Sequence, residues 1–242
     1  MIWLYSGKVG TGKSFHLMRD IIDKLMSGGY VVSNFPINFK SRIGRKLPKD
    51  HYIFLDESCW SNPRQVLKEA IRIRLKNGKT PILLAIDEAG DMFNTREWQE
   101  KTTEHDRKAW NTFFQQHRKP KYNIVLVSQS REYLDKQIRT LIDYEFKHRL
   151  INKYKFLRFM PLQIFLVIKY WCEGNKPPIM GRDLMIWRPA INKLYDTFRL
   201  FGRIGQMMDG LEDEVKREEQ KEANSLYGFR NTIWAATWEG YE

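Results

Sequence analysis

Two lysines and three glycines follow a short apolar stretch at the start of the chain, in the segment SGKVGTGKSFHL at positions 6–17. Within it, Gly7–Ser14 reads GKVGTGKS and matches the pattern G-x-x-x-x-G-K-[ST]. Such a loop surrounds a phosphate with backbone N–H groups, while its lysine reaches the β- and γ-phosphates and its hydroxyl holds Mg²⁺. Because the loop stands between an expected strand and an expected helix, whose positive dipole end adds to the site, the segment predicts nucleotide binding.

The residues of this loop have different expected roles. Lys13 is the expected phosphate lysine, and Ser14 supplies the expected Mg²⁺ hydroxyl. Lys8 is either a solvated loop residue or a second phosphate contact. The glycines permit backbone angles that a side chain would block. The predicted ATP-binding residues are Gly7, Lys8, Val9, Gly10, Thr11, Gly12, Lys13, Ser14 and Phe15.

A nucleotide hydrolase also needs a carboxylate in the magnesium shell and a group that activates water. Two Asp-Glu pairs follow apolar runs: Asp87-Glu88 after PILLAI, and Asp56-Glu57 after the weaker HYIFL. PILLAI is typical of a central strand buried on both faces. We therefore assign Asp87 to the Mg²⁺ shell and Glu88 to the attacking water, and expect the other pair to be solvated at a strand end.

Polar residues also end the next apolar run, in VSQS at positions 127–130. In a parallel sheet this strand end faces the same crevice as the phosphate loop. Gln129 could then sense the γ-phosphate or orient water. The alternative is that Ser128 or Ser130 is an ordinary helix N-cap.

Two arginines are candidates for a catalytic role between subunits: Arg96 in FNTREW and Arg118 in QQHRKP. An arginine that reaches the γ-phosphate of the nucleotide in a neighbouring subunit raises the rate of hydrolysis by several orders of magnitude. The alternative for each is a surface or structural arginine. The finger hypothesis implies a homo-oligomer.

The composition and the apolar runs argue against a disordered, a secreted or a membrane-spanning chain. Among 242 residues, 42% are hydrophobic and 29% charged, which indicates a globular fold. The net charge of +12 favours polyanionic partners, either nucleic acid, nucleotide or an anionic membrane surface. Two distant cysteines show no zinc spacing, no secretory signal opens the chain, and no apolar run reaches the length of a membrane span.

Expected strands and helices alternate along the chain, which favours an α/β fold: a P-loop NTPase with a mainly parallel sheet flanked by helices, plus a small C-terminal β/helical extension. Residues 144–171 read as a hairpin that turns near Pro161. His16 is expected to be packed or solvated, and Trp98 and Trp110 to be core. The predicted domains are 1–150 (ATPase), 151–205 (β-hairpin and helical extension of the same domain) and 206–242 (charged helix and aromatic tail).

Four segments together resemble a known family: SGKVGTGKS, IDEAGDMFNTREW, FFQQHRK and IVLVSQSREYLDKQIR. Their order and spacing are similar to those of the zonular occludens toxin (Zot) domain family, which includes assembly proteins of filamentous bacteriophages. The resemblance covers roughly residues 1–151 and continues weakly at NKLYDTF, positions 192–198.

The resemblance implies an inner-membrane ATPase that drives assembly and extrusion of a filament carrying single-stranded DNA. It places the nucleotide site at the loop glycines, Lys13, Ser14, Asp87 and Glu88. It implies a homo-oligomer, phage coat and assembly proteins as partners, and a location in the host cytoplasm at the inner membrane. Family members usually continue into a transmembrane helix, whereas this chain stops at Glu242 before such a segment. Attachment to the membrane is therefore left open.

The residues are compatible with two other functions. A genome-packaging or DNA-translocating ATPase would use the same nucleotide chemistry, with single-stranded DNA as partner. A nucleotide-gated interaction protein that does not hydrolyse ATP is disfavoured by Lys13 and Glu88. Two basic stretches, 39–50 and 144–171, could contact either DNA or the anionic inner-membrane surface, or could simply be solvated.

Overall fold

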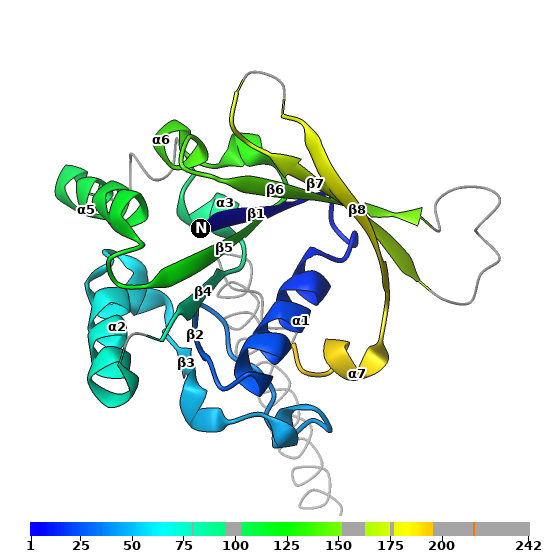
Figure 1. Ribbon diagram of the computed structural model, residues 1–242, viewed down its shortest axis with the longest axis horizontal. Coiled ribbons are helices and arrows are strands. Elements are labelled where there is room, and N and C mark those ends of the chain that lie inside the picture. The colour runs from blue at the N-terminus through cyan, green and yellow to red at the C-terminus, as the bar shows by residue number, and fades with distance from the viewer. Residues whose placement is uncertain (79, 95–102, 152–162, 175–176, 196–214, 216–242) are drawn as a thin grey trace, which may run out of the picture. The chain divides into compact units, whose positions relative to one another are not determined.

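The computed structural model describes residues 1–78, 80–94, 103–151, 163–174 and 177–195, together with Val215 (Figure 1). The chain divides into two compact units, Met1–Asp196 and Thr197–Glu242. All described residues except Val215 belong to the first unit.

A single sheet of eight strands, in the order β3-β2-β4-β5-β1-β6-β7-β8, organises the first unit. Strands β1 to β6 run parallel to one another, whereas β7 is antiparallel to both β6 and β8. The mainly parallel sheet confirms the predicted fold class. The strands are β1 (Ile2–Ser6), β2 (Tyr30–Ser33), β3 (Tyr52–Phe54), β4 (Ile82–Ile86), β5 (Tyr122–Ser128), β6 (Tyr144–Leu150), β7 (Ile164–Trp171) and β8 (Ile179–Ile186).

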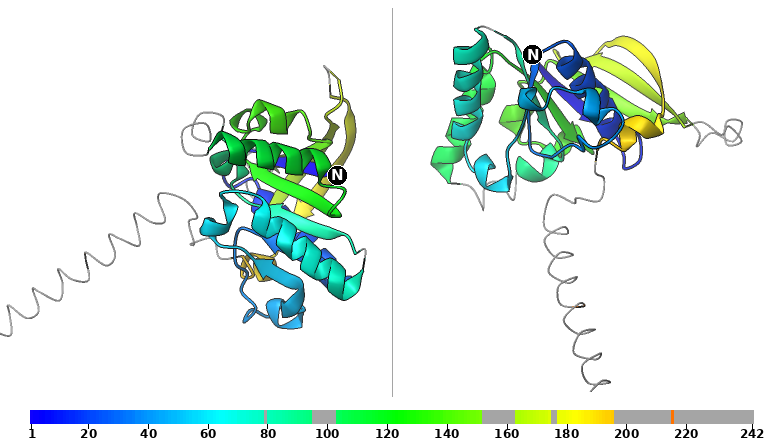
Figure 2. Two further views of the ribbon diagram at one scale, coloured as in Figure 1. Left: turned by 90° about the vertical axis from the view of Figure 1, so that its left-hand side faces the viewer. Right: turned by 90° about the horizontal axis from the view of Figure 1, so that it is seen from below.

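Helices cover both faces of this sheet. Figure 2 shows α1 and α7 on one side, and α2 and α5 on the other. Short 3-10 turns, η1 and η2, lie within and at the end of the basic stretch 39–50. The described helices are α1 (Lys13–Met26), α2 (Arg64–Asn77), α3 (Ala89–Met92), α5 (Glu104–Gln116), α6 (Lys136–Arg139) and α7 (Pro189–Asn192), with 3-10 turns η1 (Gly44–Lys46), η2 (Lys49–His51), η3 (Glu57–Trp60) and η4 (Arg131–Tyr133).

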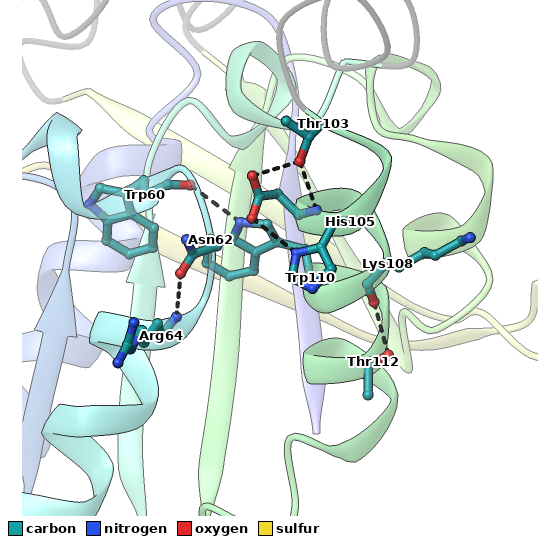
Figure 3. Close-up of polar contacts among 9 residues, drawn as sticks. Trp60, Asn62, Arg64, Thr103, His105, Lys108, Trp110 and Thr112 are labelled. Carbon is teal, nitrogen blue, oxygen red and sulfur yellow. Dashed lines mark hydrogen bonds and ion pairs between the residues drawn. The ribbon is translucent and has the colours of Figure 1, made fainter.

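The larger core lies between the sheet and helices α2 and α5. Trp110 on α5 is fully buried and stacks on Trp60, with ring centroids 6.0 Å apart. Its indole Nε1 donates a hydrogen bond to the Trp60 carbonyl at 3.2 Å, as Figure 3 shows. Thr103 caps α5 by accepting a bond from the Asp106 amide at 3.2 Å. Trp110 is thus a core residue, as predicted, while Trp98 lies outside the described residues.

Burial explains which strands the sequence revealed. All five residues of β4 are buried, as the continuous apolar run predicted. Strand β8 was not predicted, because Ile179–Ile186 is mostly exposed and carries neither an apolar run nor clean alternation. The antiparallel pairing of β6 with β7 confirms the hairpin, although its turn near Pro161 falls outside the described residues.

The C-terminal part of the chain is only partly described. Strands β7 and β8 and helix α7 join the same compact unit as β1–β6. The predicted segment 206–242 lies outside the described residues except for Val215, so the domain boundaries stay predictions. None of the described helices has the length and apolar character needed to span a bilayer.

Candidate nucleotide-binding site

Three neighbouring parallel strands end together at the candidate site. In the sheet, β5 lies between β1, which leads into the glycine loop, and β4, which leads into Asp87. Ser6 is in register with Ser128, and Ile86 with Leu126. The carboxyl ends of open parallel strands are where ligands of α/β proteins bind. The topology therefore brings the loop, the acidic pair and Gln129 to one edge.

The glycine loop is shaped by close contacts as well as by backbone angles. A Cβ on Gly7 would lie 2.6 Å from the His148 carbonyl oxygen, and one on Gly12 would lie 2.7 Å from the Phe165 ring. Both glycines have positive φ, 146° and 89°. Helix α1 begins directly after Gly12, so its free N–H groups face the loop.

Lys13 closes this loop in the structure. Its Nζ donates hydrogen bonds to the carbonyl oxygens of Gly7, at 2.8 Å, and Lys8, at 3.1 Å. Burial lowers the pKa of Lys13, and the nearby charges of Asp87 and Glu88 oppose this shift. The ammonium group therefore already lies among the groups that would surround a bound phosphate.

Ser14 and Asp87 meet across the site. The Ser14 hydroxyl donates to Asp87 Oδ2 at 3.0 Å. The backbone of Asp87 is held by buried Asn34, whose Nδ2 donates to the Asp87 carbonyl at 2.8 Å and whose Oδ1 accepts from the Asp87 amide at 2.9 Å. Strand β2 thus fixes the end of β4, because Asn34 follows β2 directly.

Glu88 has the backbone and electrostatics of a constrained residue. Its φ of 52° and ψ of 36° put it in the left-handed region, which costs free energy for a residue with a side chain. Burial raises the pKa of Glu88 to about 7, with the charges of Asp87 and Asp91 adding to the shift and Lys13 opposing it. A carboxyl group with a pKa near 7 is suited to accepting a proton at neutral pH.

The other acidic pair lies in a different environment. Asp56 and Glu57 are exposed at the end of β3, as expected. The Ser58 hydroxyl donates to Asp56 Oδ1 at 2.7 Å, and this bond lowers the pKa of the Asp56 carboxyl. The geometry thus favours Asp87-Glu88 as the functional pair.

Gln129 is exposed beside the loop, and its carbonyl oxygen accepts a hydrogen bond from the Gly7 amide at 3.2 Å. Its backbone contact supports the loop, while its sensing role stays a prediction. The N-cap alternative applies to Ser130, whose hydroxyl accepts from the Glu132 amide at the start of η4. The buried Ser128 hydroxyl donates to the Ser130 carbonyl at 2.9 Å.

Of the two candidate arginines, the structure describes Arg118, which does not lie near the loop. Arg118 follows α5 and precedes β5, and its guanidinium lies 4.0 Å from Asp143, just before β6. Both positions are at the amino-terminal edge of the sheet, opposite the phosphate loop. Arg118 therefore cannot act on a nucleotide in its own subunit, and a role in a neighbouring subunit stays a prediction. Arg96 lies outside the described residues.

The side chains of the loop differ in exposure: some face solvent and others are buried. Val9 is 75% exposed, whereas Thr11 is buried and its hydroxyl donates to the Lys8 carbonyl at 2.7 Å. Phe15 is buried against Phe165, with ring centroids 6.0 Å apart. Its side chain thus packs in the interior, so only its backbone amide could serve a phosphate. Lys8 is exposed, which leaves both of its predicted roles open.

A cavity of about 750 Å³ opens beside the loop, toward β6. Ser6, Gly7 and Gln129 contribute to its wall. Four basic residues also line it: Lys8, Arg131, Lys147 and Arg149. The cavity is large enough for the sugar and base of a nucleotide.

The residues present fit a magnesium nucleotide. Mg²⁺ prefers oxygen ligands and is usually held by one or two carboxylates together with substrate phosphates. Ser14 and Asp87 supply such oxygens next to the loop that would hold the phosphates. In the part of the chain that is described, no cluster of three or more His, Cys, Asp or Glu could form an all-protein metal site.

Sequence reasoning missed three residues around this site. Asn34 and Tyr195 both contact Asp87, and His148 Nδ1 lies 3.2 Å from the Ser6 carbonyl oxygen. Asn34 had a usable signal, because a polar residue follows the apolar strand YVVS in the same manner as Gln129 follows β5. Tyr195 lies in NKLYDTF, where the resemblance continues weakly, but nothing in that segment pointed to Asp87, and His148 belongs to no local pattern.

Comparison with known proteins identifies the family. A family model described as zonular occludens toxin (Zot) matches residues 1–157, more than half of the chain. The chain belongs to the Zot family. The resemblance found in the four sequence segments is therefore confirmed.

Relatives of this Zot-family chain include phage proteins. The Gene 1 proteins of Escherichia phage If1 and Enterobacteria phage M13 are each 27% identical to it over 150 residues, covering 58% of this chain and 39% of the relative. The match thus spans about two fifths of these relatives.

Solved structures support the fold. A DnaB-like replicative helicase, solved with its primase interactions, has a TM-score of 0.53 at 11% identity, covering 76% of this chain and 54% of that one. One solved ATPase domain has a TM-score of 0.54 at 9% identity, covering 81% and 84%. The fold is that of P-loop NTPases.

Proposed function

We propose that this Zot-family chain binds and hydrolyses Mg-ATP and acts as a motor for assembly and extrusion of a filamentous phage at the host inner membrane. The hydrogen bond between Ser14 and Asp87 carries the nucleotide part of the proposal. It joins the end of the phosphate loop to the carboxylate after a central strand, which is the pairing that a magnesium phosphate site requires.

The chain's own groups divide the work as follows. Backbone N–H groups of the loop and the N-terminus of α1 bind the phosphates, and Lys13 neutralises their charge. Bound Mg²⁺ would supply further charge neutralisation, with Ser14 and Asp87 as the residues that hold it. Glu88 orients the attacking water and accepts its proton, for which its raised pKa suits it. In this proposal Gln129 senses the γ-phosphate or orients water.

Assembly into a homo-oligomer completes the proposal. An arginine from one subunit would reach the nucleotide of the next, with Arg118 and Arg96 as candidates. Subunits with Arg118→Ala mixed with Lys13→Ala subunits should recover part of the lost turnover, because some interfaces then hold both groups intact. A failure of Arg118→Ala and of Arg96→Ala to complement at any mixing ratio would contradict the finger hypothesis.

The phage part of the proposal rests on family membership and on the Gene 1 relatives. It places the chain in the host cytoplasm at the cytoplasmic face of the inner membrane, with coat and assembly proteins as partners. The exposed basic residues Arg42, Arg45 and Lys46 suit an anionic lipid surface, where each basic residue contributes about 1 kcal/mol.

A DNA-translocating or genome-packaging ATPase is the second candidate. The four basic residues that line the cavity beside the loop favour it, because they could contact the backbone of single-stranded DNA. DNA contacts release counterions, so DNA-stimulated turnover by such a pump should fall steeply with salt.

One set of turnover assays separates the two candidates. ATP hydrolysis is measured with single-stranded DNA, with anionic vesicles and with coat protein, each against protein alone. The extrusion motor should respond to vesicles or coat protein, and neutralising Arg42, Arg45 and Lys46 should weaken vesicle binding while turnover in solution is kept. If the same substitutions abolish DNA-stimulated turnover and leave vesicle binding unchanged, the DNA pump is the better account. Absence of turnover under all conditions would contradict both.

A further inference from the structure

A tyrosine from the end of the first unit reaches the proposed magnesium site. The Tyr195 hydroxyl donates a hydrogen bond to Asp87 Oδ2 at 2.7 Å. This is the carboxylate oxygen that also accepts from the Ser14 hydroxyl at 3.0 Å. Two hydroxyl groups, 181 positions apart in the sequence (195 − 14), thus converge on one oxygen atom.

The segment that carries Tyr195 runs across one face of the sheet to reach Asp87. After β8, at one end of the strand order, the chain forms α7 next to α1 and then returns to the residues that follow β2 (Figure 1). Tyr195 forms an antiparallel bridge with Ile37, and the Asn38 amide donates to the Leu194 carbonyl at 2.8 Å. Leu194 is fully buried, so the segment is anchored immediately before the tyrosine.

The tyrosine ring is also fixed by packing. It meets Phe35 edge to face, with ring centroids 5.2 Å apart. Phe35 follows Asn34, which holds the backbone of Asp87. The side chain and the backbone of Asp87 are therefore held by two different segments, Tyr195 on the side chain and Asn34 on the main chain.

We propose that Tyr195 is a positioning residue for the magnesium site, whose hydroxyl holds the Asp87 carboxylate in the orientation that Mg²⁺ binding needs. The inference rests on the proposed nucleotide function. When Ser14 serves as a ligand of the metal, Tyr195 is the remaining side-chain donor to Asp87 among the hydrogen bonds described for that carboxylate. A neutral phenol is suited to this task, because it orients the carboxylate without cancelling its charge.

The test separates Mg²⁺ binding from nucleotide binding. The affinity of Tyr195→Phe for a fluorescent ADP analogue is measured in EDTA and across a Mg²⁺ titration. A hydrogen bond to a charged group is worth about tenfold or more in affinity, of which positioning through Asp87 carries a part. We therefore expect the Mg²⁺ concentration for half-maximal tightening to rise about five- to tenfold, while the affinity in EDTA stays that of the wild type.

The matched control is Tyr52→Phe, which also removes a buried hydroxyl. That hydroxyl contacts the Ser33 hydroxyl at 2.6 Å and the Phe35 carbonyl at 2.5 Å, and it makes no hydrogen bond to Asp87 among those described. Tyr52→Phe should lower the melting temperature without altering the Mg²⁺ titration. On an Asp87→Asn background, Tyr195→Phe should have no further effect on Mg²⁺ dependence, because the two residues act through one bond.

Each outcome decides something. An equal loss of affinity with and without Mg²⁺, or no change in either, would overturn the positioning role. The same would hold if Tyr52→Phe reproduced the Mg²⁺ effect, since that would indicate general loosening. A wild-type protein that binds no nucleotide would instead refute the proposed function, which keeps the two failures distinct.

Discussion

The Ser14 hydroxyl lies 3.0 Å from Asp87 Oδ2, although 73 positions separate the two residues in the sequence. The contact exists because β1 and β4 end on either side of β5 at the same edge of the sheet. The contact brings the glycine loop and the acidic pair, which are separate patterns in the sequence, into one site. The first two predictions concern residues of that site.

Replacing Lys13 should abolish turnover. Lys13→Ala removes the ammonium group that now bridges the Gly7 and Lys8 carbonyls and that would face the β- and γ-phosphates. We expect a loss of at least about 100-fold in the rate of ATP hydrolysis, the usual effect of removing one preorganised charge-stabilising donor. Lys76→Ala, which changes an exposed lysine in the last turn of α2, is the control and should keep most of the activity. Equal effects of the two changes would contradict the assignment of Lys13.

Replacing Glu88 should block hydrolysis without preventing binding. Glu88→Gln keeps the shape of the side chain but removes the proton acceptor, so we expect turnover to fall about 10²- to 10⁴-fold. Bound ATP should then persist, as measured by filter binding of labelled nucleotide. Glu57→Gln changes the exposed acidic pair at the end of β3 and should leave hydrolysis unchanged. Trapping of ATP by Glu57→Gln instead would show that the acidic pair after β4 is not the functional one.

The pH dependence of catalysis should report the environment of Glu88. Its pKa is raised to about 7, first by burial and then by the charges of Asp87 and Asp91. Because the base must be ionised, kcat/KM should rise as pH passes upward through about 7. Asp91→Asn removes one of the raising charges, so the acidic limb should move to lower pH. Asp50→Asn, at the exposed turn before β3, is the control and should not move it.

How far the sequence predicted the site depends on whether the signal was local. The glycine loop is one continuous segment of the sequence, and PILLAI is apolar because β4 is buried along its whole length. Both could therefore be recognised from the sequence. The position of Arg118 could also have been predicted from the sequence. A residue that precedes a parallel strand lies at the edge opposite to one that follows it. The position of Tyr195 could not have been predicted in this way. Its approach to Asp87 depends on how α7 and the residues after β2 pack, which no local sequence pattern determines.

Removing Asn34 should destabilise the end of β4. Its amide satisfies both the N–H and the C=O of Asp87 inside the protein. Asn34→Ala leaves these buried groups unpaired, so the free energy of unfolding should fall by about 1–3 kcal/mol. Denaturant unfolding measures this, and Asn38→Ala, which changes an exposed asparagine, is the control. A similar loss in both variants would show that the Asp87 contacts are not the cause.

A buried polar cluster behind the loop should control stability in acid. His16 stacks on Tyr5, with ring centroids 4.4 Å apart, and its Nδ1 lies 2.9 Å from His148 Nε2. The Tyr5 hydroxyl in turn hydrogen-bonds Asp20. Burial lowers the pKa of His16 to about 3 and that of His148 to about 4, with Arg19 adding to the first shift and Lys13 to the second. Burial raises the pKa of Asp20 to about 6.

These shifts have opposite effects on stability near pH 5. There the two histidines bind protons only when the chain is unfolded, which lowers stability as pH falls below about 6.5. Asp20 binds its proton in the folded state and not in the unfolded one, which raises stability as pH falls from about 6 toward 4. The net difference is one proton, so this cluster should cost about 1.4 kcal/mol per pH unit of acidification near pH 5.

Two single substitutions should move this slope in opposite directions. His148→Gln removes one of the protons gained on unfolding, so the contribution of the cluster to the slope should fall close to zero. Asp20→Asn removes the compensating carboxyl group, so that contribution should about double. The measurement is the free energy of unfolding by denaturant between about pH 6.5 and pH 4.5, read as a slope so that a uniform loss of stability does not affect it. Parallel slopes in the wild type and both variants would show that these buried groups do not set the acid stability of the fold.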